Sequence, residues 1–389
     1  SGVFASGADL LVVTGTDNDI DAQFGSALDL ENSTIDMTFD SLTSTNGPEE
    51  GIRLNTVAGT GTTSGLVANS VTVYNSALNG IEVVNSSANI DIATVLVDGA
   101  GDRGVLLGGN SGTFTAGPTE VYNTINSGIE VVSVTNSAIF GDTLVSDTGY
   151  YGVHVQNTGP GGYVTFGDTS IYNSASAGIT IDNNNDTVAF GDVLVDEAAD
   201  DDGVGSIRVL NNNDSVVFGD TTITERHGDG IYINNANASI DFGVTQIDTV
   251  EAAADNLENG IWVMGSTANG DITYNSIVIT GSNKNGILID GPAAGDFTVL
   301  HTTTITDAQY NGIVISNMSG DTTFTEQTTI TNAGTTSGDG VNIDTSTGVI
   351  TFNDLDISTV NGSGVFASGA DLLVVTGTDN DIDAQFGSA

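Results

Sequence analysis

The chain has 389 residues, of which 51 are glycine, 4 are proline and none is cysteine. Its 50 acidic residues against 5 basic ones give a formal charge of −45, which opposes binding to nucleic acid or to an anionic membrane. The lack of cysteine excludes a disulfide framework and a thiolate metal site. No signal peptide or run of 18 apolar residues is present, so we expect any export signal or anchor to lie outside this segment.

The first 27 residues, SGVFASGADLLVVTGTDNDIDAQFGSA, recur unchanged as residues 363–389. Identity over this length indicates duplication rather than convergence. The offset of 362 residues predicts that residues 1–362 form one tandem unit and that residues 363–389 begin the next identical unit. The whole segment, residues 1–389, is then expected to be a single continuous β-solenoid.

A shorter repeat runs through the unit and is marked by a glycine before a β-branched or aliphatic residue. It starts at Gly2 and continues, by way of the Gly25-Ser26 pair, to Gly51, Gly80, Gly104, Gly128, Gly152, Gly178, Gly203, Gly230, Gly260, Gly286, Gly312, Gly340 and Gly364. The mean spacing of about 26 residues is the length of one coil of a three-sheeted solenoid. Alternation after each glycine, as in Ile81 and Val83, places one face of a strand in the core.

A second motif lies upstream of the glycine in each coil, as in Phe140-Gly141-Asp142-Thr143, and predicts a bend between two strands. Its aspartates are Asp142, Asp168, Asp192 and Asp220. Stacked coils would hold these carboxylates about 5 Å apart, where like charges repel. They either fan outward into water as ordinary turn residues or hold a hard cation such as Ca²⁺ between coils. No cofactor is certain, and Ca²⁺ is the one that this pattern admits.

Asparagine recurs five residues after the glycine, or after the Ser206 that replaces it. The positions are Asn85, Asn157, Asn183, Asn211, Asn235 and Asn317. Stacked side-chain amides would form a ladder along the axis. The alternative is that asparagine is present for its tolerance of left-handed turn geometry.

These spacings predict an all-β fold, a right-handed parallel β-helix of three sheets with about 15 coils. The coils resemble those of the pectin-lyase-like superfamily, in the form found in large repetitive bacterial surface and adhesin proteins. The resemblance covers essentially the whole chain and concerns architecture, because that scaffold carries lyases, hydrolases, tailspikes and passive stalks alike.

Enzymes of that superfamily balance an acidic sugar with arginine or lysine, and such residues are scarce here. Arg53, Arg103, Arg208, Arg226 and Lys284 fall in different coils. The nearest match to a galacturonase site is Asp201-Asp202 with His227 one coil later, but its Arg-x-Lys element is missing. We therefore interpret the charge run around Asp201 as a solvated loop and expect no enzyme activity.

The residue between the two inward positions after each glycine is expected on the outer face of its sheet. In order these residues are Glu82, Leu106, Glu130, His154, Thr180, Arg208, Tyr232, Trp262, Leu288 and Val314, and the last four form an apolar stripe on four consecutive coils. A contiguous apolar row on an acidic rod suggests a contact. The candidates are a neighbouring fibre, a sugar ring, or a loop of this chain around residues 251–259.

The sequence favours a non-catalytic extracellular or cell-surface fibre or stalk, built from tandem 362-residue units that continue head to tail or associate side by side. The alternatives are a carbohydrate-binding adhesin and, less favoured, a polysaccharide lyase or hydrolase. Expected partners are further copies of the chain and glycans, with no nucleic acid and no direct membrane contact.

Overall fold

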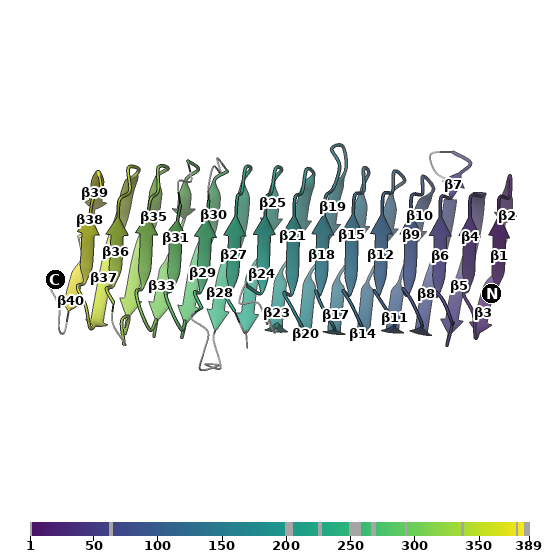
Figure 1. Cartoon of the computed structure of the whole chain (residues 1–389), viewed down its shortest axis with the longest axis horizontal. Coiled ribbons are helices and arrows are strands. Elements are labelled where there is room, and N and C mark those ends of the chain that lie inside the picture. Colours follow the sequence, from purple (N-terminus) through teal and green to yellow (C-terminus); the bar gives the residue numbers. More distant parts are fainter. Residues whose placement is uncertain are drawn as a thin grey trace. The chain divides into compact units, whose positions relative to one another are not determined.

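The computed structural model describes residues 2–61, 65–198, 205–224, 228–248, 258–265, 270–291, 294–335, 338–378 and 380–384. The chain divides into two compact units, residues 1–191 and 192–389, and each is a parallel β-solenoid (Figure 1). The predicted fold class is confirmed: the chain is all-β, with about 14 coils of about 25 residues, and no described residue lies in a helix.

The strands that follow the repeated glycine form one parallel sheet in each unit, which we call sheet A. Its strands pair coil by coil with no slip, so that Val105 of one coil lies beside Ile81 of the coil before and Ile129 of the coil after. In the first unit the strands are β1 (Val3–Ser6), β4 (Leu28–Glu31), β6 (Ile52–Asn55), β9 (Ile81–Val84), β12 (Val105–Gly108), β15 (Ile129–Val132), β18 (Val153–Gln156) and β21 (Ile179–Asp182). In the second they are β24 (Ile207–Leu210), β27 (Ile231–Asn234), β29 (Ile261–Met264), β31 (Ile287–Asp290), β34 (Ile313–Ser316), β36 (Val341–Asp344) and β38 (Val365–Ser368).

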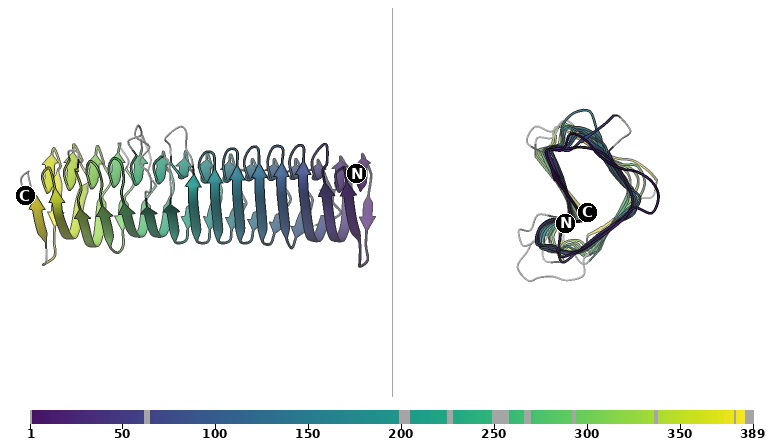
Figure 2. Two further views of the ribbon diagram at one scale, coloured as in Figure 1. Left: turned by 90° about the horizontal axis from the view of Figure 1, so that it is seen from below. Right: turned by 90° about the vertical axis from the view of Figure 1, so that its right-hand side faces the viewer.

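The other two faces of each coil are formed by strands that also pair in parallel with the coils before and after (Figure 2). In the first unit these are β2 (Leu11–Val13), β3 (Asp19–Gln23), β5 (Thr34–Thr45), β7 (Ala58–Gly59), β8 (Gly65–Ser76), β10 (Asn89–Ile92), β11 (Val95–Ala100), β13 (Phe114–Ala116), β14 (Thr119–Thr124), β16 (Ala138–Phe140), β17 (Thr143–Thr148), β19 (Tyr163–Phe166), β20 (Thr169–Ser174) and β22 (Thr187–Phe190). In the second they are β23 (Val193–Ala198), β25 (Val216–Phe218), β26 (Thr221–Thr224), β28 (Ile240–Asp248), β30 (Ile272–Thr280), β32 (Phe297–Val299), β33 (Thr303–Thr306), β35 (Thr322–Thr331), β37 (Val349–Val360), β39 (Leu372–Val375) and β40 (Asp381–Ala384).

The expected bend between these two faces is not always a break in the strand. In the coil of Phe218-Gly219-Asp220 the bend separates β25 from β26. In the next coil β28 runs through Gly243 without interruption, because its backbone continues to pair with β30 on both sides of that residue. Two predicted strands are therefore fused into one long strand in several coils.

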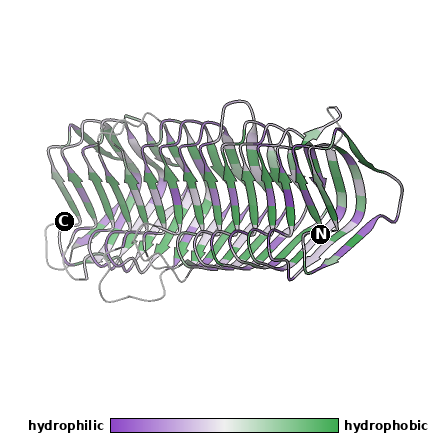
Figure 3. Ribbon diagram, turned by 45° about the vertical axis from the view of Figure 1, so that its right-hand side comes forward, coloured by the Kyte–Doolittle hydropathy of each residue, from purple (hydrophilic) through white to green (hydrophobic). Residues whose placement is uncertain are grey.

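In most strands of each unit, buried apolar residues that form the core alternate with more exposed ones. Figure 3 colours the strands by the hydropathy of their residues. One inward position carries an aromatic ring in successive coils. The rings of Phe140, Phe166 and Phe190 in the first unit follow one another at 4.8 Å and within 5° of parallel. This distance is the spacing between neighbouring strands, so the rings stack face over face along the solenoid.

The repeated glycine marks a corner where the backbone of the next coil passes close by. A Cβ at Gly104 would lie 2.6 Å from the carbonyl oxygen of Gly128, which leaves no room for a side chain. Two sequence assignments shift by a few residues at this corner. Ala27, rather than the Gly25-Ser26 pair, precedes the strand that pairs with β1, and Ser206 precedes β24, while Gly203 lies outside the described residues.

Candidate functional site

The four aspartates proposed as cation ligands lie at exposed turns. The carboxylates of three of them, Asp142, Asp192 and Asp220, bind the backbone of the next coil. Oδ1 of Asp142 accepts a hydrogen bond from the backbone N–H of Asp168 at 3.3 Å. In the second unit, Oδ1 of Asp192 accepts from the N–H of Asp220 at 3.0 Å, and Oδ1 of Asp220 accepts from the N–H of Val244 at 2.9 Å. Each of these bonds joins one coil to the next through a charged acceptor, which strengthens it.

No three His, Cys, Asp or Glu side chains are grouped as metal ligands among the residues that the structure describes. The hydrogen bonds to the next coil give these aspartates a structural role that does not require a cation. The same arrangement recurs at another turn of the second unit, where Oδ1 of Asp271 and Oδ1 of Asp296 accept from the next coil at 3.0 and 2.9 Å.

The predicted asparagine ladder combines both of its proposed explanations. All six residues have a positive φ between 48° and 57°, the left-handed conformation that asparagine tolerates better than most residues: Asn85, Asn157, Asn183, Asn211, Asn235 and Asn317. Hydrogen bonds between side-chain amides accompany this conformation where successive coils both carry an asparagine. Nδ2 of Asn183 donates to Oδ1 of Asn157 at 2.6 Å, and Nδ2 of Asn235 donates to Oδ1 of Asn211 at 3.1 Å.

A second polar ladder, which sequence reasoning missed, lies in the second unit at the residue directly before the repeated glycine. We call it the inner ladder, and its members are Asp229, Asn259, Asn285, Asn311 and Asp339. The first three are at most 5% exposed. The sequence signal was an acid or amide before Gly230, Gly260, Gly286, Gly312 and Gly340.

The bonds of the inner ladder all run in one direction along the chain. Oδ1 of Asn285 accepts from the backbone N–H and from Nδ2 of Asn311, at 3.2 and 3.0 Å. Nδ2 of Asn285 in turn donates to Oδ1 of Asn259 at 2.9 Å. The ladder continues to Asp339, whose Oδ1 accepts from the N–H of Ser363 at 2.7 Å. These bonds give hydrogen-bond partners to the buried side chains of Asp229, Asn259 and Asn285, as a buried polar group requires.

The four residues of the apolar stripe occupy equivalent positions on neighbouring strands of sheet A. Trp262 lies beside Tyr232 on one side and Leu288 on the other, and Leu288 lies beside Val314. The aromatic side chains of the stripe are largely buried rather than exposed on the surface. Tyr232 is 6% exposed, and burial raises the pKa of its hydroxyl. Nε1 of Trp262 is buried and has no acceptor in the part of the chain that the structure describes. Residues 251–257 of the candidate covering loop lie outside that part.

The same face of sheet A carries a charged row in the first unit. Arg53 lies between Asp29 and Glu82 on neighbouring strands, with nitrogen–oxygen distances of 3.0 and 3.7 Å. Although burial alone would lower the pKa of Arg53, the hydrogen bond and charge of Asp29, together with Glu31 and Glu50, raise it. Burial raises the pKa of the nearby Glu50, and the charge of Glu82 adds to this effect.

Two of the basic residues that are scattered in the sequence share a position in their coils. Arg53 and Arg208 take the same outward position on sheet A, in different units. Arg103 lies just before β12 and pairs with Asp102 at 2.7 Å and, through Nε, with Glu130 on the outer face. Arg53 and Arg103 are therefore both neutralised by carboxylates of this chain.

Two tyrosines and a histidine form an aromatic cluster in the first unit, and the histidine lies beside Glu130. His154 follows Glu130 on the neighbouring strand β18, and its ring centroid is 4.8 Å from that of Tyr151. The ring of Tyr150 is 4.0 Å from that of Tyr151 and is 45% exposed, and the two hydroxyls are hydrogen-bonded at 3.1 Å. This aromatic cluster was not expected from the sequence, where Tyr150 and Tyr151 stand outside the alternating pattern.

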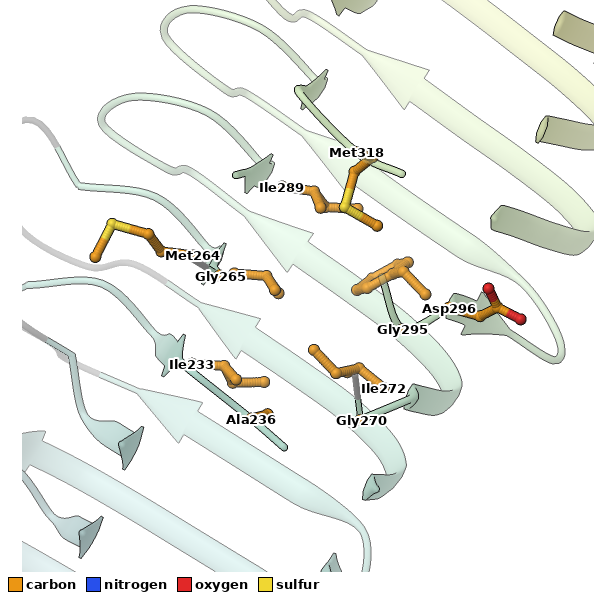
Figure 4. Close-up of a pocket in the computed structure, with 12 residues that line it drawn as sticks. Ile233, Ala236, Met264, Gly265, Gly270, Ile272, Ile289, Gly295, Asp296 and Met318 are labelled. Atoms are coloured by element: carbon orange, nitrogen blue, oxygen red, sulfur yellow. The ribbon is translucent and has the colours of Figure 1, made fainter. Parts of the chain in front are cut away.

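One cavity interrupts the described core of the second unit. It has a volume of about 10 Å³ and is lined by apolar groups including Ile233, Val263, Ile289 and Met318 (Figure 4). Gly265 takes the corner position filled by Asn235 or Asn317 in other coils. A space this small lies at the lower limit for one water molecule, and its lining is mainly apolar although it includes Asp296, so it is a packing defect rather than a ligand site.

The residues closest to a catalytic pattern, Asp201, Asp202 and His227, lie outside the described residues, as does Arg226. The described residues contain no helix long and apolar enough to cross a bilayer. Comparison with protein-family models, curated proteins and solved structures finds no significant match to this chain.

Proposed function

We propose that the chain is a non-catalytic structural fibre or stalk, located outside the cell and built from tandem 362-residue solenoid units. The observation that carries this proposal is the exact recurrence of residues 1–27 as residues 363–389, with both copies forming a coil of three strands. A solenoid coil buries its core by stacking on its neighbours, so a repeated coil at a fixed offset is suited to indefinite continuation.

The chemistry of the coils supports the same conclusion. Polar side chains at the turns, such as Asp220 and Asn285, donate to or accept from adjacent coils. The two described arginines of the first unit are held by carboxylates of the chain itself. The resemblance to the pectin-lyase-like superfamily, in its repetitive surface-protein form, is part of this proposal. The formal charge of −45 suits a solvated surface in a salty or cation-rich medium.

Electron microscopy of the native material tests the fibre. We expect thin rods of uniform width, and isolated globular particles would contradict the proposal. A parallel assay on pectin, polygalacturonate and alginate should show no turnover. Reproducible turnover that is lost in His227→Ala would establish an enzyme instead.

The aromatic cluster of Tyr150, Tyr151 and His154 favours a second candidate function, the binding of glycans. Tyr150 is exposed, and His154 of the same cluster lies beside Glu130, which pairs with Arg103. An exposed aromatic ring near fixed charged groups is suited to stacking and hydrogen bonding with sugar rings. Glycan-array binding that is lost in Tyr150→Ser and kept in Tyr163→Ser, a similarly exposed tyrosine, would support this function. Equal binding by both variants would reject this site.

A further inference from the structure

The two copies of the repeated segment form the same strands. Residues Val3–Ser6 form β1 and residues Val365–Ser368 form β38, and Asp19–Gln23 and Asp381–Ala384 form β3 and β40. The turn conformation is also the same, with φ of +71° at Gly7 and +72° at Gly369. One coil geometry is therefore observed in two different surroundings.

Each copy reveals a different neighbour of this coil. The first copy lies against the coil that follows it, with Val3 beside Leu28, Leu11 beside Ile35 and Ile20 beside Leu42. The second copy lies against the coil that precedes it. There Val365 lies beside Val341, Leu373 beside Ile350 and Ile382 beside Ile357. Together the two copies specify both sides of one coil.

We propose that the far edge of the coil formed by β38, β39 and β40 binds residues 28–45 of a second copy of the repeating unit, in the register that β1, β2 and β3 show. This inference rests on the proposed function and specifies how one 362-residue unit joins the next. Val365 would lie beside Leu28 of the next unit, Leu373 beside Ile35 and Ile382 beside Leu42. The partner is therefore another copy of this chain, joined as a continuing solenoid.

Apolar burial favours this occupant. Val365, Leu373 and Ile382 are only half-buried, and Val375 is 39% exposed although its neighbour Phe352 is fully buried. Leu28, Ile35 and Leu42 of the next unit would cover them. In this chain the same three residues are fully buried where they contact the first copy. The junction would thus bury a matched apolar surface that already exists elsewhere in the chain.

Polar groups at the edge are matched as well. The N–H of Gly7 donates to the carbonyl of Glu31 at 2.9 Å, and the N–H of Ala8 donates to Oγ of Ser33 at 3.1 Å. The equivalent N–H groups of Gly369 and Ala370 have no acceptor among the described residues. Residues 28–45 of a following unit would supply both acceptors, which are the groups that an open sheet edge lacks.

A side-chain ladder would also continue across the junction. In the second copy, the N–H of Asp381 donates to Oδ1 of Asp356 at 3.2 Å. In the first copy, Oδ1 of the equivalent Asp19 accepts from the hydroxyl of Ser41 at 2.6 Å. Joined in sequence, these contacts give an uninterrupted row from Asp356 through Asp381 to Ser41 of the next unit.

Amide hydrogen exchange tests this junction. It is compared between the 389-residue chain and a longer chain that contains two 362-residue units, called the two-unit chain. In the two-unit chain, residues 28–362 follow directly after Ala389, so Gly369 and Ala370 occur once and lie at the junction. Exchange at Gly369 and Ala370 should slow by at least about 100-fold in the two-unit chain, because both amides gain acceptors in a packed coil. Gly7 and Ala8, which have their partners in either chain, are the internal control. Unchanged exchange at Gly369 and Ala370, with Gly7 protected, would overturn the proposal.

A variant adds a second, independent readout. Leu28→Asp, placed only in the appended unit, should restore fast exchange at Gly369 while Gly7 stays protected, because it puts a charge into the junction core. Continued protection of Gly369 in this variant would contradict the register. Rods in the microscope together with an unprotected Gly369 would contradict the proposed junction but support the fibre proposal. Globular particles with a protected Gly369 would reject the fibre and keep the junction.

Discussion

Asn259 donates from both its backbone nitrogen and its Nδ2 to a single oxygen, Oδ1 of Asp229, at 2.6 and 2.9 Å. Both residues are at most 2% exposed. A charged acceptor at one end of a row of neutral amides explains how a carboxylate is retained in a buried position, since two donors are directed at one of its oxygens. The inner ladder is accordingly a stability element, and its members can be tested individually.

Replacing Asn285 by alanine should lower the free energy of unfolding by about 2–3 kcal/mol, because Oδ1 of Asn259 and the N–H of Asn311 would lose their partner in a buried site. Urea unfolding measures the change. Asn237→Ala is the matched control, because Asn237 is exposed and makes one side-chain bond to Asn213 at 2.9 Å. We expect that control to stay within about 0.5 kcal/mol of the parent chain. Equal effects of the two variants would contradict a special role for the inner ladder.

The turn aspartates allow a test that separates hydrogen bonding from cation binding. Asp220→Asn keeps an oxygen that can accept from the N–H of Val244, whereas Asp220→Ala removes it. We expect the alanine variant to lose about 0.5–1.5 kcal/mol and the asparagine variant to lose less. Thermal melting in calcium and in chelator, at matched ionic strength, should give the same difference between variants. A loss in Asp220→Asn that appears only in calcium would establish a bound cation.

Trp262→Ser is expected to lower stability by about 1–3 kcal/mol, because the indole packs on Tyr232 at a centroid distance of 5.0 Å with its nitrogen enclosed. Thermal melting measures stability, and light scattering measures association of the same samples. Val314→Ser, at the other end of the stripe, is the control for lateral contact. Lost association with unchanged melting in both variants would show instead that the stripe joins neighbouring fibres.

Glu50 gives a prediction about pH. Burial, followed by the charges of Glu82 and Glu49, raises the pKa of this carboxyl above its usual value. The folded chain then binds the proton more tightly than the unfolded chain, so ionised Glu50 is destabilising at neutral pH and this effect disappears as the pH falls through the raised pKa. Glu50→Gln should therefore unfold at a higher urea concentration than the parent chain at pH 7.

The advantage of Glu50→Gln should shrink as the pH is lowered toward 4. The neighbouring Glu49 is exposed, so Glu49→Gln is the control and should show a smaller advantage at pH 7. A stabilisation by Glu50→Gln that is independent of pH would contradict the proposed origin in a buried charge.

The sequence was sufficient to predict the coil but not the details of its polar ladders. Strict alternation at positions such as Ile81 and Val83 identifies an inward face, because burial of one strand face leaves a period of two. The inner ladder was missed since the residue before the repeated glycine varies in the first unit, where it is Glu50, Asn79, Arg103, Ser127, Tyr151 or Ala177. Only the second unit carries amides there in consecutive coils.

The aromatic cluster could not be predicted for a different reason. Tyr150 and Tyr151 lie in the segment before a repeated glycine, where no periodicity fixes the direction of a side chain. Their contact with His154 depends on how that segment curves toward sheet A, which is a tertiary property. The outward positions of Arg53 and Arg208 did follow from alternation, but the neutralisation of Arg53 by Asp29 required the registered pairing of strands.

The direction of the bonds between coils has a mechanical consequence. Within each unit these bonds lie along the stacking direction, so a pulling force along it would detach one coil at a time rather than shear many bonds together. A coil of about 25 residues contributes about 4.8 Å to the stack but about 80–90 Å when its backbone is fully extended. Each detached coil would therefore lengthen the molecule many times over, and such a chain would absorb a sudden load by extending stepwise instead of breaking.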